Sequence, residues 1–147
     1  MSQSQGQNQS LSIRNQLPGT VTAIASGEVM ATVKVRLDGG QEITAAITLD
    51  AVKDLGITEG SAVRALVKST EVALATGAVD GLSIRNQIPG TITEVATGGA
   101  MAGVKLDVRG GSLTAAITKD AAADLGLTTG ASVVALIKST EISLAKA

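Results

Sequence analysis

The sequence contains no cysteine, no histidine and no aromatic residue among its 147 residues. Without cysteine it can form no disulfide, no thiolate nucleophile and no zinc ribbon. Without histidine it has no imidazole base and no histidine-ligated metal site. Without aromatic rings it lacks the faces on which single-stranded nucleic acid stacks. The groups left for chemistry are carboxylates, hydroxyls, lysine and arginine.

The charge is close to balanced, with 12 Lys+Arg against 13 Asp+Glu and a formal net charge of −1. A chain of this kind lacks the basic excess of a nucleic-acid-binding protein. No apolar run approaches the roughly 18 residues that a membrane-spanning helix needs. Residues 1–10 are Gln/Ser-rich and uncharged, which is unlike a signal peptide and predicts a disordered tail. The expected location is therefore the cytoplasm.

The same unit occurs twice along the chain. When residues 11–74 are aligned with residues 82–144, about 38 of 63 positions are identical, which is a tandem duplication. The two copies are joined by a short segment that contains two glycines, residues 76–81. The predicted organisation is a tail at 1–10, a first domain at 11–75, a linker at 76–81 and a second domain at 82–147.

Within each unit the apolar residues mostly recur with a period of two, which indicates half-buried strands. The period changes after Thr48, which is placed to cap a helix of about two turns that ends at Gly56. The Gly-Gly pairs at 39–40 and 110–111 are typical of hairpin turns. In the first unit the expected strands are 19–25, 29–37, 42–48, 62–68 and 71–75.

Three strands, a short helix and two more strands follow the order of a small Greek-key barrel. The predicted fold is therefore mostly β, with two tandem OB-type five-stranded barrels that each carry one short helix. A unit of about 65 residues without aromatics buries little surface by itself. The missing burial has to come from the sister unit or from other chains, so we expect an oligomer.

Carboxylates one helical turn apart, Asp50 with Asp54 and Asp120 with Asp124, could form an acid/base pair. The simpler interpretation is that the first of each pair lies near the positive end of the helix and the second is a solvated surface charge. No other reactive group converges on them, and the sequence does not favour an enzyme.

Two polar segments stand out: Ser12 to Asn15, and Lys68 to Thr70 where one strand breaks into the next. A tetrahedral oxyanion accepts hydrogen bonds at four oxygens, which suits an arginine fork, a lysine, hydroxyls and free backbone N–H groups together. The alternative is that Arg14 and Lys68 lie at barrel rims and the hydroxyls cap a turn. Spacing alone favours that alternative.

Several motifs recur in the same order in both units: Ser-Ile-Arg-Asn-Gln, Pro-Gly-Thr, Thr-Ala-Ala-Ile-Thr, Asp-Leu-Gly and Ala-Leu-Val/Ile-Lys-Ser-Thr-Glu. This set resembles the molbindin family, whose Mop domain is a molybdate-binding module. The module is also found as the TOBE domain of molybdate transport ATPases and of a molybdate-responsive repressor. The resemblance covers 11–74 and 82–144, so the chain is similar to a di-domain molbindin.

The resemblance implies a cytoplasmic protein that stores and buffers molybdate and tungstate by reversible binding, without catalysis, cofactor or directly bound metal cation. It implies a homotrimer of six lobes with oxyanions held at interfaces between lobes, and no nucleic-acid or membrane partner. The oxyanion-binding residues that it implies are Ser12, Ile13 (through its backbone N–H), Arg14, Asn15, Thr48, Lys68 and Ser69, with Ser83, Ile84, Arg85, Asn86, Thr118, Lys138 and Ser139 in the second unit.

One position near these residues differs between the units, because Lys119 replaces Leu49 directly after the threonine. The added charge predicts two unequal sets of sites. Two other functions stay open. One is a molybdate-sensing regulatory module, which an attached nucleotide-binding or helix-turn-helix domain would mark; these 147 residues contain neither. The other is a structural oligomer that binds no ligand.

Overall fold

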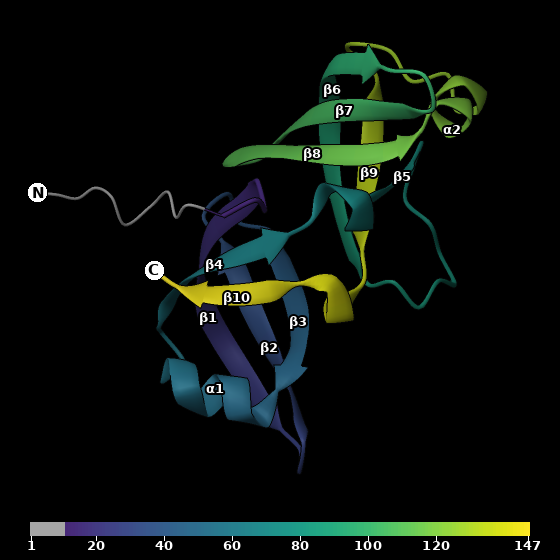
Figure 1. Ribbon diagram of the computed structural model, residues 1–147. Helices are drawn as coiled ribbons and strands as arrows, with labels where there is room; N and C mark the ends of the chain where they lie inside the picture. Colours follow the sequence, from purple (N-terminus) through teal and green to yellow (C-terminus); the bar gives the residue numbers. More distant parts are fainter. Residues whose placement is uncertain (1–10) are drawn as a thin grey trace, which may run out of the picture.

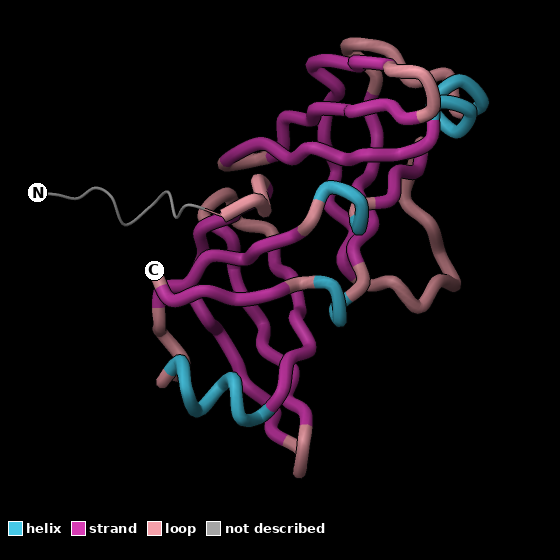
Figure 2. Tube along the Cα trace, in the orientation of Figure 1, coloured by secondary structure: helices cyan, strands magenta, loops and turns pink. Residues whose placement is uncertain are grey.

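The computed structural model describes residues 11–147, and the tail predicted at 1–10 lies outside the described residues (Figure 1). Ten strands form two five-stranded antiparallel sheets, which confirms the mostly β prediction (Figure 2). The first repeat forms β1 (Asn15–Ser26), β2 (Met30–Leu37), β3 (Glu42–Thr48), α1 (Leu49–Leu55), β4 (Ala62–Val67), the 3-10 helix η2 (Ser69–Glu71) and β5 (Ala73–Ala75). The second repeat forms β6 (Asn86–Thr97), β7 (Met101–Val108), β8 (Gly111–Thr118), α2 (Lys119–Asp124), β9 (Ser132–Ile137), the 3-10 helix η3 (Ser139–Glu141) and β10 (Ser143–Lys146).

The period-two pattern is confirmed most clearly in β2. Its buried and exposed residues alternate along the whole strand, with Val33 and Val35 fully buried and Lys34 exposed between them. The apolar side chains of one face pack into the core while the polar side chains face solvent, as expected of a sheet with one buried face.

The strand β1 begins four residues earlier than expected, because Pro18 and Gly19 do not end it. Pro18 pairs with Arg64 on β4, and its carbonyl accepts from Asp38 N at 3.0 Å. A side chain at Gly19 would lie 2.7 Å from the Arg36 carbonyl oxygen, so the glycine permits the close approach of β2. A β-bulge at Thr22 then bends the strand. Together they let one long strand serve as the centre of a curled sheet.

The short helix forms as predicted. The Thr48 hydroxyl accepts from Ala51 N at 3.1 Å and caps the start of α1. At the other end Gly56 adopts φ 65°, a left-handed conformation that favours glycine. Val52 is buried against the core. Thr118 caps α2 in the same way.

Each sheet is completed by a strand from the other repeat. The strand orders are β10-β4-β1-β2-β3 in what we call the first lobe and β5-β9-β6-β7-β8 in the second lobe. The sequence predicted that each unit would use its own fifth strand, and this was wrong. Figure 1 shows β10 beside β4 and β5 beside β9. The reason is η2 and η3, which carry the chain away from β4 and β9 and onto the other lobe.

The exchange buries apolar residues as well as pairing strands. Val72 and Ile142, each directly after a 3-10 helix, are both 2% exposed and belong to the common core. The 3-10 helix η3 packs on β3, and η2 packs on β8. The sister repeat therefore supplies part of the burial that a small unit lacks.

The two lobes also meet at their hairpin turns. A side chain at Gly39 would lie 2.0 Å from the Arg109 carbonyl oxygen, and one at Gly110 would lie 2.6 Å from Gly39 N. The Gln41 side chain donates to the Arg109 carbonyl at 3.2 Å. The Gly-Gly pairs are thus hairpin turns, as predicted, and they also allow close contact between the lobes. No helix among residues 11–147 is both long and apolar enough to cross a membrane.

Candidate oxyanion site

The fold brings the two polar motifs of each repeat together. Asn15 pairs with Val67 across β1 and β4, so the segment that ends at Asn15 lies beside Lys68. In the second repeat Asn86 pairs with Ile137 across β6 and β9, and this places Ser83 to Asn86 beside Lys138. Segments more than 50 residues apart in sequence thus form one cluster per repeat.

The charged residues of both clusters are accessible. Arg14, Lys68, Arg85 and Lys138 are exposed, while Ser69 and Ser139 are half-buried. Within residues 11–147 neither Arg14 nor Arg85 makes a hydrogen bond or an ion pair. Each guanidinium therefore keeps its full fork of donors for a ligand.

The backbone of the Ser-Ile-Arg-Asn motif is fixed by the glutamine that follows it. The Gln16 amide donates to the Ile13 carbonyl at 3.0 Å, and Gln87 donates to the Ile84 carbonyl at 3.2 Å. These are the residues whose backbone N–H the resemblance assigns to an oxyanion. The motif is therefore held in the same local turn in both repeats.

The asparagine of each motif is buried, with 3% of its surface exposed, and forms hydrogen bonds with the backbone of the other repeat. Asn15 Nδ2 donates to the Thr114 carbonyl at 2.8 Å, and its Oδ1 accepts from Thr114 N at 2.8 Å. Asn86 makes the same two bonds to the backbone of Thr44, both at 2.9 Å. Each polar cluster is thereby anchored to the third strand of the opposite repeat.

The second cluster borders a pocket of about 250 Å³. Lys138 and Ile84 line it together with Thr70 and Val72 of the first repeat, and β8 supplies Ile117. The pocket therefore lies where a polar cluster of one repeat meets the exchanged segment of the other.

Thr48 and Thr118 lie apart from both clusters within one chain. Thr48 is four residues beyond Thr44 on β3, which is about 13 Å along an extended strand. Both threonines are exposed and serve as helix caps. Lys119 is exposed next to Thr118, whereas the matching Leu49 is half-buried. The structure therefore separates Thr48 from the cluster that is anchored at Thr44, and Thr118 from the cluster that is anchored at Thr114.

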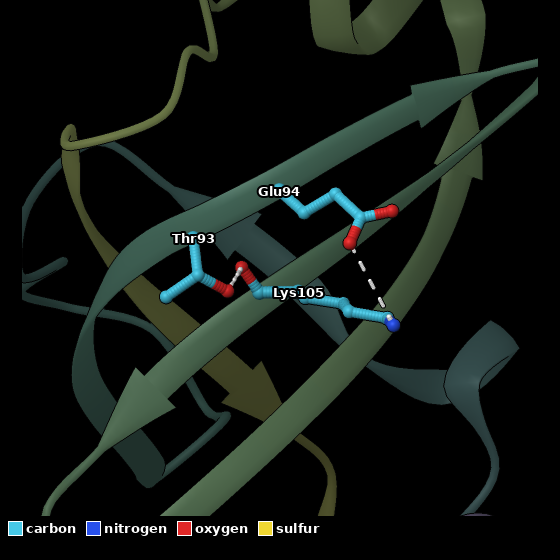
Figure 3. A network of polar contacts seen from close by, with 3 residues as sticks. All are labelled: Thr93, Glu94 and Lys105. Carbon is cyan, nitrogen blue, oxygen red and sulfur yellow. Dashed lines mark hydrogen bonds and ion pairs between the residues drawn. The ribbon is translucent and has the colours of Figure 1, made fainter.

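Outside the two clusters, the structure of residues 11–147 contains an ion pair on the surface of the second lobe. Figure 3 shows Glu94 and Lys105 with Thr93 on the paired strands β6 and β7. Lys105 Nζ lies 3.7 Å from Glu94 Oε1, and both side chains are more than half exposed. The bulge residue Thr93 donates through its hydroxyl to the Lys105 carbonyl. An exposed pair of this kind contributes little to stability. In the part of the chain that the structure describes, no group of three or more acidic residues could hold a metal ion.

Two features of the site were missed by sequence reasoning. The partners Thr44 and Thr114 belong to the repeated Thr-Ala-Ala-Ile-Thr motif, which was the available signal, but nothing in that motif shows that the contact crosses between repeats. The buried Arg64, which donates to Gln16 Oε1 at 2.5 Å behind the motif, was hidden because its counterpart is Val134.

Comparison with known proteins supports the resemblance found in the sequence. The model of the TOBE domain matches residues 11–74 and again residues 82–144. The molybdenum-pterin-binding protein MopB of Rhodobacter capsulatus is 40% identical over 136 residues, which cover 91% of this chain and 50% of MopB. The molybdenum transport protein ModE of Herbaspirillum seropedicae is 39% identical over 136 residues, which cover 91% of this chain and 51% of ModE. This chain spans about half the length of these relatives.

Similarity to a solved structure extends over almost the whole chain. The molybdate-bound form of ModG, described as a cytoplasmic molybdate-binding protein, matches with a TM-score of 0.90 at 38% identity, over 94% of this chain and 99% of ModG. The molybdenum-pterin-binding protein 3 of Clostridium pasteurianum is 45% identical over 65 residues, which cover 44% of this chain and 96% of that protein. A single repeat therefore has the length of one complete relative.

Proposed function

Because this chain belongs to the TOBE domain family, we propose that it binds molybdate reversibly and without chemistry. The observation that carries the proposal is the convergence of the Ser-Ile-Arg-Asn and Lys-Ser motifs into one accessible cluster per repeat. A dianion loses strong hydration on leaving water, and several well-placed donors have to replace it. Hydrogen bonds to an ion contribute about 1.5–3 kcal/mol each, so several of them together can replace the hydration that the dianion loses.

The proposed oxyanion ligands are residues that the family resemblance implies. Arg14 supplies a two-pronged fork, Lys68 a point charge, and Ser12 and Ser69 hydroxyl protons, while Ile13 offers its backbone N–H. In the second repeat the same roles fall to Arg85, Lys138, Ser83, Ser139 and Ile84. The roles of Asn15 and Asn86 are considered below.

We further propose that the sites are completed between chains. The exposed caps Thr48 and Thr118 lie about 13 Å from the anchored threonines of their own strands. They reach an oxyanion only if another copy brings its polar cluster to the start of α1 or α2. A homotrimer of six lobes is the proposed assembly, and cytoplasmic storage of molybdate and tungstate is its proposed role.

Native mass spectrometry with and without molybdate tests assembly and ligand together, because one spectrum reports the number of chains and the number of bound ions. We expect three chains per assembly and discrete molybdate adducts. A monomer at micromolar concentration that takes up no ion would reject both parts of the proposal.

The control is to replace molybdate by other tetrahedral dianions. Tungstate is nearly the same size as molybdate and should raise the unfolding temperature similarly, since a ligand that binds only the folded state stabilises it. Sulfate has the same charge but is smaller, and a site built for the larger ion should hold it loosely. Equal shifts from all three would reduce the proposal to a generic anion site.

A molybdate-sensing regulatory module is the second candidate function. The observation that favours it is that this chain matches half the length of the molybdenum transport protein ModE. In that role the lobes would report molybdate to a partner domain instead of storing it. Dissociation constants would then lie near the free molybdate concentration to be sensed, which isothermal titration measures directly.

A further inference from the structure

The side-chain amide of Asn86 has all its hydrogen-bonding protons in use. It has two N–H protons and one carbonyl oxygen. Nδ2 donates to the Thr44 carbonyl at 2.9 Å and to Ser139 Oγ at 3.4 Å, while Oδ1 accepts from Thr44 N at 2.9 Å. The residue is 3% exposed. No amide proton remains for an oxyanion, which can only accept.

The bond to Ser139 has a chemical consequence. A serine hydroxyl has one proton to donate and lone pairs that accept. When Oγ accepts from Asn86, the hydroxyl proton is directed away from Asn86 and is available to another acceptor. This is the orientation in which a serine can donate to a dianion.

We propose that Asn86 is a positioning residue and not a ligand: it anchors the second polar cluster to β3 of the first repeat and holds the Ser139 hydroxyl as a hydrogen-bond donor toward the bound oxyanion. The inference rests on the proposed molybdate-binding function and deepens it. It replaces the direct ligand role that the resemblance implies for this asparagine.

The first repeat provides a matched control inside the same chain. Asn15 makes the same two bonds to the backbone of Thr114, both at 2.8 Å, and is equally buried. Within residues 11–147, however, its amide makes no hydrogen bond to Ser69. Asn15 therefore provides the anchor between repeats without orienting its serine.

The test is a pair of double-mutant cycles measured by isothermal titration of molybdate into the full chain. One cycle combines Asn86→Ala with Ser139→Ala, and the other combines Asn15→Ala with Ser69→Ala. Such cycles isolate the coupling between two side chains from their separate effects. Thermal unfolding of each variant without ligand reports the loss of the anchor separately.

We expect Asn86→Ala and Ser139→Ala each to weaken one class of site about tenfold or more, and the double variant to be weakened by clearly less than the product of the two single effects, because the orientation of the Ser139 hydroxyl can be lost only once. The effects of Asn15→Ala and Ser69→Ala should multiply. Should Asn86→Ala fail to fold, Asn86→Ser also removes both amide protons while it leaves a smaller cavity, and it serves in its place.

Independent effects at Asn86 and Ser139 would overturn the positioning role, and so would coupling of equal size at Asn15 and Ser69. In either case the native chain would still bind molybdate, so the proposed function would survive. A native chain that binds no molybdate would reject the function and the positioning role together.

Discussion

The glutamines at matching positions of the two repeats share one hydrogen bond and differ in their other partners. Gln16 and Gln87 both donate to the isoleucine carbonyl of the preceding polar motif. Their other hydrogen bonds differ. Gln16 Oε1 accepts from the buried Arg64. Gln87 Oε1 accepts from Val79 N in the linker at 3.1 Å, and Gln87 Nε2 donates to the Val79 carbonyl at 2.9 Å. The backbone turn that presents the motif is thus maintained in both repeats, while its outer support has changed.

This difference shows which hydrogen bonds can be replaced after a duplication without loss of the backbone conformation that they support. Val134 stands where the first repeat has Arg64. The second glutamine has no arginine at that position, and the linker backbone supplies its partners instead. The residue types of the proposed ligand set are the same in both repeats, whereas the residues that support the motif from behind differ.

The largest expected effect comes from the contact between the lobes. Gly39→Ala would place a methyl group 2.0 Å from the Arg109 carbonyl oxygen, and neither backbone can move without disturbing its hairpin. We expect a loss of about 3 kcal/mol in the free energy of unfolding, measured by denaturant titration. Gly111→Ala, whose nearest neighbour is Leu17 at 3.8 Å, is the matched control and should change stability by less than about 0.5 kcal/mol. Equal effects would show that the lobes do not meet there.

The next comparison concerns the two guanidinium groups. Arg14→Ala should weaken one class of molybdate site by about 2 kcal/mol of binding free energy and leave the other class unchanged, and Arg85→Ala should do the reverse. Arg14→Lys should also weaken binding, because a point charge cannot make two parallel hydrogen bonds. Isothermal titration reports both stoichiometry and affinity. Unchanged values in the Arg14/Arg85 double variant would remove these residues from the site.

A smaller effect should follow from making the first repeat resemble the second. Arg64→Val removes the donor to Gln16 Oε1, and we expect thermal unfolding to show a loss of about 1–2 kcal/mol. The loss in the Gln16→Leu/Arg64→Val double variant should be smaller than the sum of the two single losses, because the bond between the two side chains can be lost only once. The opposite result, a loss in the double variant at least as large as that sum, would mean that Arg64 acts through other contacts.

The smallest effect is expected for the surface ion pair of the second lobe. Ala23 occupies the position in the first repeat that Glu94 occupies in the second. Because Glu94 and Lys105 are both more than half exposed, Glu94→Ala should change the unfolding free energy by less than about 0.5 kcal/mol. A shift in the midpoint of denaturant unfolding well beyond that would make the pair a real difference between the lobes.

Local structure was predictable where a residue type strongly favours one conformation or one capping role. Thr48 as helix cap, Gly56 as left-handed terminus and the limits 42–48 of β3 all follow from the sequence. The start of β1 did not, because Pro18 and Gly19 normally break a strand and are tolerated here by the close approach of β2. For the candidate site, the motifs could be read from the chain, but their anchorage on the opposite repeat could not.

Strand exchange could not be predicted because the two repeats are so alike. A fifth strand with the same alternation fits β4 or β9 equally well, and the choice depends on the direction that η2 and η3 give to the chain. The same ambiguity hid the partners of Asn15 and Asn86, since a threonine backbone at the required place exists in both repeats.

The exchanged strands also set an order of events during synthesis on the ribosome. The edge of the first lobe is closed by β10, which lies at residues 143–146, although the other four strands of that sheet are complete by residue 67. A chain emerging from its amino end therefore completes four strands of this sheet before the strand that closes it in the final fold has been translated. Open strand edges invite pairing with other chains. During that interval the edge of β4 is open to β5 of the same chain and to strands of neighbouring nascent chains on the same messenger RNA.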